Sequence, residues 1–216
     1  MTNITRTQEA KPAKARGRIE NVQLPTEIHP LAISQARAFA NLARSLAAAI
    51  ADGGDDGERL AYQVNAGLSI ELYLKALMIG GRGGLVTTGH HLDKLYETLP
   101  SFLKEFLEAT YSSLQPADGW KVSLKAFKFG TTPAAQRGPG TTPRPKFNSF
   151  AASMETWSNA FVQARYFFEK VNSDDWAIFE YAPGPLDAAM QALDLAYQHL
   201  LAGSFQAAKD MLNKAS

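Results

Sequence analysis

Apolar residues recur with a helical period along most of the chain, and the longest such stretch runs from Leu60 to Ile79. At 100° per residue, Leu60, Val64, Leu74 and Met78 lie close to one line, which neighbouring leucines and isoleucines widen into a broad apolar face. The narrow face left for water consists of Tyr62, Asn65, Ser69, Tyr73 and Ala76. Because a helix that is apolar on most sides is normally surrounded by its neighbours, we expect this segment to be the central helix of a bundle.

One carboxylate interrupts the apolar face of this helix. Glu71 lies about 20° from the middle of the apolar line, and Lys75 follows one turn later. Glu followed by Lys at i+4 is the favoured order for a helical ion pair, and a solvated pair would contribute only about 0.3–0.5 kcal/mol. A buried carboxylate without a partner would cost several kcal/mol. The apolar position therefore favours a buried network in which Glu71 also contacts another helix.

Further amphipathic segments flank the central one. Pro30 opens the first predicted helix, and the glycine-rich run 52–57 ends it and caps the next. Beyond the loop 80–89, which holds five glycines and is expected to be a mobile connection, short helices follow His90 and Pro100. The remaining elements are a long helix over 150–171, a short extended piece over 176–181, a last long helix over 185–203 and a weak terminal helix.

These elements predict the all-α class, with about six or seven helices in one bundle over residues 29–216. Residues 1–28 are polar, basic and poor in aromatics, so we expect a flexible N-terminal arm. A loop insertion occupies residues 116–147, where four prolines prevent a regular helix: Pro133, Pro139, Pro143 and Pro145. It is either a hairpin-like excursion or a long surface loop.

The composition restricts the cellular compartment of the protein but does not indicate a binding partner. The 216 residues carry a net charge of +1, so the total charge indicates neither nucleic acid nor membranes. The absence of cysteine excludes disulfides and thiolate metal sites. No apolar run approaches the ~20 residues that span a bilayer, and the N-terminus lacks the apolar core of a signal peptide. We expect a cytoplasmic protein that does not enter a membrane.

The basic residues are concentrated in two places, of which the insertion is the more informative. Residues 120–147 contain six basic and no acidic side chains: Lys121, Lys125, Lys128, Arg137, Arg144 and Lys146. Aromatic residues stand between them, as in surfaces that bind single-stranded nucleic acid through stacking and phosphate contacts. The alternative, which we favour from the sequence, is a solvated insertion whose aromatics anchor it to the core.

Metal and phosphate-loop sites are not expected. His90 and His91 are adjacent and diverge by 100° on a helix, and no HExxH motif or acidic partner at ligand spacing accompanies them. The glycine loop 80–89 follows no strand and lacks the Gly-Lys-Ser/Thr ending of a phosphate-binding loop. The sequence therefore gives no reason to expect a metal or another cofactor.

Three motifs carry a family resemblance: SIELYLKAL at 69–77, GHHLDKLYETLP at 89–100 and ARYFFEK at 164–170. Over about residues 57–200 the chain resembles the HEPN superfamily of helical prokaryotic proteins, in particular branches with E-x-x-x-K, Gly-His-x-Leu and Arg-Tyr-x-x-Glu motifs. The matching positions are Glu71, Lys75, Gly89, His90, Leu92, Arg165, Tyr166 and Glu169. The resemblance implies a polar centre made of Glu71, Lys75, Tyr166 and Glu169.

Members of that superfamily are helical bundles, often dimeric, in toxin–antitoxin, phage-defence and RNA-processing systems. Their active branches are metal-independent endoribonucleases with an Arg, four to six residues and then a His. This chain departs from that motif, because seven residues separate Arg82 from His90 and no histidine follows Arg165 before His199. The departure counts against ribonuclease activity.

Three functional hypotheses follow. The favoured one is a HEPN-like binding module that engages RNA, a nucleotide or a protein partner such as a nucleotidyltransferase, and for which the resemblance implies a homodimer. The second is a ribonuclease with a rearranged site, in which His90 acts as acid or base and Arg165 stabilises a pentavalent phosphate. The third is a purely structural or interaction protein, whose polar centre only fixes the register of the helices.

Overall fold

The computed structural model describes residues 20–53, 55–120, 123–128, 147–165 and 176–203, with the backbone alone for residues 56, 123–128, 159–165 and 176–181. These residues form a helical bundle, which confirms the predicted all-α class. The helices are α1 (His29–Ala51), α2 (Asp56–Gly81), α3 (Leu92–Glu97), α4 (Ser101–Leu114), α5 (Phe150–Arg165) and α7 (Pro183–Leu201).

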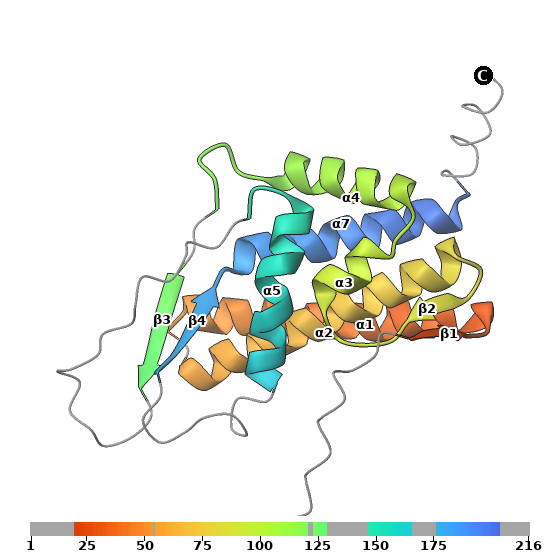
Figure 1. Cartoon of the computed structure of the whole chain (residues 1–216). Coiled ribbons are helices and arrows are strands. Elements are labelled where there is room, and N and C mark those ends of the chain that lie inside the picture. Colours follow the sequence, from red (N-terminus) through yellow and green to blue (C-terminus); the bar gives the residue numbers. More distant parts are fainter. Residues whose placement is uncertain (1–19, 54, 121–122, 129–146, 166–175, 204–216) are drawn as a thin grey trace, which may run out of the picture.

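The central position predicted for α2 is confirmed, since α2 packs against α1, α3, α5 and α7 (Figure 1). The start of α2 is fixed by a capping box: Asp55 accepts a hydrogen bond from the backbone N–H of Glu58, and the Glu58 side chain accepts one from the backbone of Asp55. This reciprocal arrangement satisfies two backbone donors that a helix N-terminus otherwise leaves free. The glycine-rich run therefore ends α1 and starts α2, as predicted.

The face of α2 predicted to contact water is instead buried. Tyr62, Ser69, Tyr73 and Ala76 are at most 2% exposed, because α1 and α7 cover them. The small side chains of α1, Ala36, Ala40 and Ala43, are fully buried and let the two backbones approach, so that the hydroxyl of Ser69 donates to the carbonyl of Ala36 at 2.8 Å. The partly exposed face of α2 carries Ala61, Val64, Asn65, Leu68, Leu72 and Lys75.

The last residues of the predicted basic arm belong to the folded domain. Strand β1 (Asn21–Gln23) pairs antiparallel with β2 (Leu85–Thr87), and a short 3-10 helix, η1 (Thr26–Ile28), leads into α1. The glycine-rich loop 80–89 was expected to be a mobile connection. It contains strand β2, in which Val86 and Thr87 are buried. The loop is ordered because the two segments satisfy one another's backbone groups, and such a long-range pairing leaves no local pattern in the sequence. Residues 1–19 lie outside the described residues.

The insertion contributes one strand to a second short strand pair. Strand β3 (Ser123–Lys128) pairs antiparallel with β4 (Trp176–Tyr181), and the register places Lys125 opposite Phe179 and Lys128 opposite Trp176. In the view of Figure 1 these strands lie at one end of the bundle. The extended piece predicted at 176–181 is therefore a strand, and its partner comes from the predicted hairpin-like excursion.

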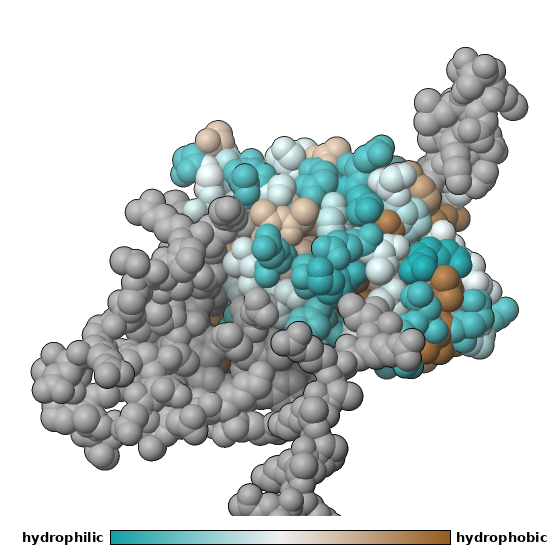
Figure 2. All heavy atoms as spheres, viewed as in Figure 1, coloured by the Kyte–Doolittle hydropathy of each residue, from teal (hydrophilic) through white to brown (hydrophobic). Residues whose placement is uncertain are grey.

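The described part of the chain has no helix that is both long and apolar enough to cross a membrane. In the view of Figure 2, the described surface is mostly hydrophilic or neutral, and the hydrophobic residues are scattered in small areas. The large apolar side chains are concentrated in the core around α2, where Ile70, Leu74, Leu77 and Met78 have no exposed surface.

Candidate functional site

The carboxylate of Glu71 is the centre of a polar cluster between α2 and the loop that precedes α3. Its Oε1 accepts a hydrogen bond from Nζ of Lys75 at 2.6 Å, and its two oxygens lie 2.9 and 3.0 Å from Nδ1 of His90. The buried network expected from the apolar position of Glu71 is present and includes the pair with Lys75, but its third residue comes from the loop before α3 and not from another helix. The third residue is an imidazole.

The cluster is buried at its base and open at its rim. The side chain of Glu71 is 6% exposed, that of Lys75 23% and that of His90 50%. Because a carboxylate only accepts hydrogen bonds, Nδ1 of His90 carries the hydrogen in this contact, and Nε2 is the nitrogen left for another partner. Glu71 therefore fixes both the orientation and the tautomer of a half-exposed histidine.

Contacts on both sides of His90 hold its loop in place. Before it, Oγ1 of Thr88 accepts from the backbone N–H of Glu20, and the hydroxyl of Thr87 bonds Oδ1 of Asn21 at 3.0 Å. After it, the hydroxyl of Ser158 on α5 donates to Asp93. Strand β1 and helix α5 thus position the loop from two directions, although neither is close to it in sequence.

Most of the other predicted site residues cannot be placed against this cluster. Arg165 is the last residue of α5, and its side chain lies outside the described part, as do Tyr166, Glu169, Lys121, Arg137, Arg144 and Lys146 altogether. Lys125 and Lys128 are described by their backbone positions in β3. The meeting of His90 with Arg165 stays a prediction. Among the residues that the structure describes, no three His, Asp or Glu side chains are grouped as a metal site would require.

A second polar cluster lies on the opposite side of α2, and the sequence did not reveal it. Oδ1 of Asp194 on α7 accepts from Nε of Arg37 on α1 at 2.8 Å and from the hydroxyl of Tyr73 on α2 at 3.0 Å. Its Oδ2 accepts from Gln198 at 2.8 Å. Tyr73 was predicted to face water. The signal in the sequence is a tyrosine on an apolar helix, because its hydroxyl requires a partner when buried.

The electrostatics of this second cluster favour a charged aspartate beside a neutral phenol. Burial opposes ionisation of Asp194, but the hydrogen bonds from Arg37, Gln198 and Tyr73 outweigh it and hold the pKa of Asp194 below its usual value. Burial and the neighbouring carboxylate raise the pKa of Tyr73 well above its usual value. The hydrogen bond to Asp194 also raises the pKa of Arg37.

The fold and the first cluster define a helical bundle that presents a carboxylate-held histidine and lysine at its surface. Comparison of the chain with known protein families, with characterised proteins and with solved structures gives no match.

Proposed function

We propose that the protein is a HEPN-like binding module that engages RNA, with His90 and Lys75 contacting the phosphate backbone. The observation that carries this proposal is the hold of Glu71 on both residues, at 2.6 Å from Lys75 Nζ and 2.9 Å from His90 Nδ1. A buried carboxylate that orients two donors at a partly exposed rim prepares them for an anionic ligand without the entropy cost of ordering them on binding.

The strand pair β3–β4 supports RNA as the ligand. Its register sets Lys125 and Lys128 opposite aromatic residues of β4, and the rest of the segment 120–147 adds four basic residues and no acidic one. Basic residues that lie opposite aromatic ones on the neighbouring strand favour single-stranded nucleic acid, because phosphates pair with the cations and bases stack on the rings. The resemblance adds two further proposals, a homodimer and a nucleotidyltransferase partner.

RNA binding is tested with the purified protein and a mixed set of short single-stranded RNAs. We expect His90→Ala to weaken binding several-fold and His91→Ala, which removes the adjacent exposed imidazole, to leave it unchanged. Replacing Lys125 and Lys128 by Gln should weaken binding further and flatten its dependence on salt. An affinity that ignores salt and these lysines would contradict the RNA proposal; equal binding by wild type and both histidine variants would leave the polar cluster a structural role.

The same geometry supports a second candidate, a metal-independent ribonuclease. The Nδ1 contact with Glu71 leaves Nε2 of His90 as the nitrogen that exchanges a proton with the ribose hydroxyl or the leaving oxygen, as a general acid or base requires. Arg165 would supply the positive charge for the phosphate. Incubation with labelled RNA in the presence of a chelator separates the candidates: cleavage by wild type and His91→Ala but not by His90→Ala supports the enzyme, and no cleavage by any of them excludes it.

A further inference from the structure

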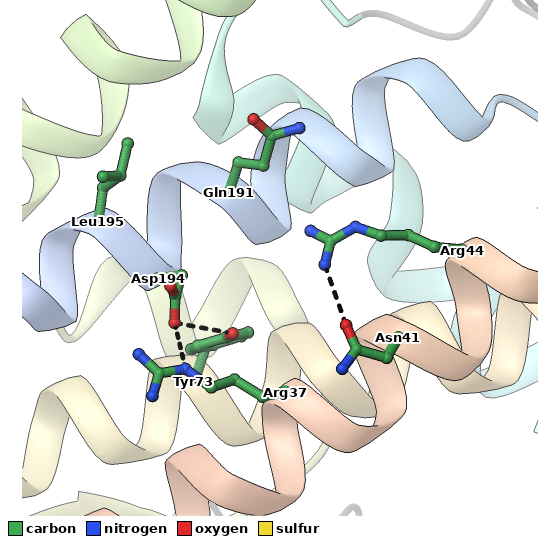
Figure 3. Close-up of a pocket in the computed structure, with 7 residues that line it drawn as sticks. All are labelled: Arg37, Asn41, Arg44, Tyr73, Gln191, Asp194 and Leu195. Atoms are coloured by element: carbon green, nitrogen blue, oxygen red, sulfur yellow. Dashed lines mark hydrogen bonds and ion pairs between the residues drawn. The ribbon is translucent and has the colours of Figure 1, made fainter.

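A groove runs between α1 and α7 on the side of α2 opposite to His90. It has a volume of about 380 Å³ and is lined by Arg37, Asn41, Arg44, Tyr73, Gln191, Asp194 and Leu195 (Figure 3). Glu71 and Tyr73 are two residues apart on α2, so they point about 200° apart around the helix. The groove is therefore independent of the RNA site proposed above.

Both arginines of the groove are held by an aspartate of α7 in the same way. Nε of Arg37 donates to Oδ1 of Asp194 at 2.8 Å, and Nε of Arg44 donates to Oδ1 of Asp187 at 2.6 Å. Each of these hydrogen bonds uses Nε, so it leaves the two terminal nitrogens of the guanidinium uncommitted to the aspartate. The side chains of Arg37 and Arg44 are 47% and 43% exposed, which keeps those terminal nitrogens accessible to a ligand.

The aspartates, in contrast, have their oxygens occupied. Asp194 accepts hydrogen bonds from Arg37, Tyr73 and Gln198. Asp187 accepts one from Arg44 and, on its other oxygen, one from Gln191 at 2.6 Å. Among the terminal nitrogens, Nη1 of Arg44 donates to Oδ1 of Asn41 at 3.4 Å. Since the acceptors of the groove are engaged and most of the terminal arginine donors remain for a ligand, one rich in acceptor oxygens fits the groove better than a cation does.

The spacing of the arginines indicates how many anionic groups the ligand carries. Arg37 and Arg44 are seven residues apart on α1, which places them two turns and about 10 Å apart on one face. Figure 3 shows the guanidinium of Arg44 extending past Asn41 toward Gln191, while that of Arg37 lies beside Asp194. A second hollow of about 270 Å³ shares Arg44 with the groove and is also lined by Asp187 and by Pro183 and Gly184 at the N-terminus of α7, whose helix dipole favours an anion.

We propose that this groove binds a small molecule with two phosphate groups set several ångströms apart, such as a sugar bisphosphate. One phosphate contacts the terminal nitrogens of Arg37, and the other contacts those of Arg44. Asn41, midway between them on α1, donates its amide N–H to the spacer or to a phosphate oxygen. Asp194 and Asp187 act as positioning residues, because they hold each guanidinium by Nε in the orientation that the phosphates require.

The test is a calorimetric titration of the protein with fructose 1,6-bisphosphate at low salt. We expect the bisphosphate to bind at least about tenfold more tightly than glucose 6-phosphate, because only the former engages both arginines. Arg37→Gln or Arg44→Gln should reduce the affinity for the bisphosphate to that for the monophosphate. Arg37→Lys should not restore it, since an ammonium cannot contact Asp194 and a phosphate with the fork geometry of arginine.

A variant at an exposed position shows that any loss of binding is not caused by unfolding. Asn41 is exposed, and Asn41→Asp keeps an acceptor for Arg44 while adding a negative charge to the groove. We expect it to abolish bisphosphate binding at an unchanged melting temperature, with Lys94→Gln, a loss of positive charge elsewhere, as a control that binds normally.

Failure of wild type to bind the bisphosphate, equal affinity for both sugars, or normal binding by Asn41→Asp would each overturn the proposal. So would a homodimer that Asn41→Asp dissociates, because the groove would then be a contact between two copies. Loss of RNA binding in the His90→Ala variant with bisphosphate binding retained would confirm that the two sites are separate.

Discussion

The carboxylate of Glu108 on α4 caps the N-terminus of α5, where Phe150 begins the helix. Its Oε2 accepts from the backbone N–H of Phe150 at 2.8 Å, and its Oε1 accepts from the N–H of Ala151 at 2.9 Å and from the hydroxyl of Tyr96 at 2.9 Å. One side chain thus joins α3, α4 and α5. It supplies both a hydrogen-bond acceptor and a negative charge to the helix end.

Replacing this cap should destabilise the whole domain. We expect Glu108→Ala to lower the free energy of unfolding by about 1–3 kcal/mol, because it removes a charged cap and leaves a tyrosine hydroxyl without its acceptor. Urea denaturation followed by circular dichroism measures this difference. Glu105→Ala, which removes an exposed carboxylate from the same helix, is the control and should change stability by less than about 0.5 kcal/mol.

Glu71 should contribute to both stability and binding. Glu71→Gln keeps the size of the side chain but removes the charge that holds Lys75 and His90, so we expect a loss of about 1–3 kcal/mol in unfolding free energy. His90→Ala should cost less, because its side chain is half exposed. If denaturation shows the reverse order, the histidine and not the carboxylate organises the cluster.

Substitutions at two adjacent glycines distinguish the cost of backbone strain from the cost of a steric clash. Gly83 and Gly84 both have positive φ values, +60° and +91°, yet a Cβ on Gly83 would meet nothing within 4 Å, whereas one on Gly84 would lie 2.2 Å from the carbonyl oxygen of Leu24. We expect Gly83→Ala to cost about 1–2 kcal/mol through strain alone. Gly84→Ala should cost clearly more, since β1 must move. Equal thermal midpoints for the two variants would contradict the close approach of Leu24.

The second cluster should make the free energy of unfolding depend on pH in the acid range. The folded-state pKa of Asp194 lies below its ordinary value of 3.8, so its contribution to stability is present above that value and is lost as the pH falls through the folded pKa. Asp194→Asn should flatten the decrease in unfolding free energy between about pH 5 and pH 2. Asp118→Asn, at an exposed position, should leave the decrease as in the wild type.

The predictions made from sequence succeeded where the signal was local. The run 52–57 was predicted to end one helix and cap the next, and Asp55 within it caps α2; the i+4 spacing of Glu71 and Lys75 predicted their ion pair. The apolar character of α2 identified it as central. The same character concealed its orientation, because a helix that is apolar nearly all round has no preferred face in its periodicity.

Long-range pairing accounts for what the sequence could not reveal. Arg37 and Asp194 meet across 157 positions of the chain, and Asn21 meets Thr87 across 66. Strands of three residues such as β1 are too short for a period-two pattern to identify them. The partner of Glu71 was predicted to come from another helix; it is His90, because the loop after β2 folds back onto α2.

The pairing of β1 with β2 has a consequence for anyone who shortens the protein. Cutting the chain at residue 29, the boundary that composition favours, would leave all six described helices intact. It would also delete Glu20 and Asn21, which form hydrogen bonds with Thr88 and Thr87. Thr88 is two residues before His90, so these bonds help to position the histidine. Such a truncated domain should still unfold in one cooperative transition, but the imidazole of His90 would be poorly oriented. A native-like circular dichroism spectrum would then hide a damaged binding surface.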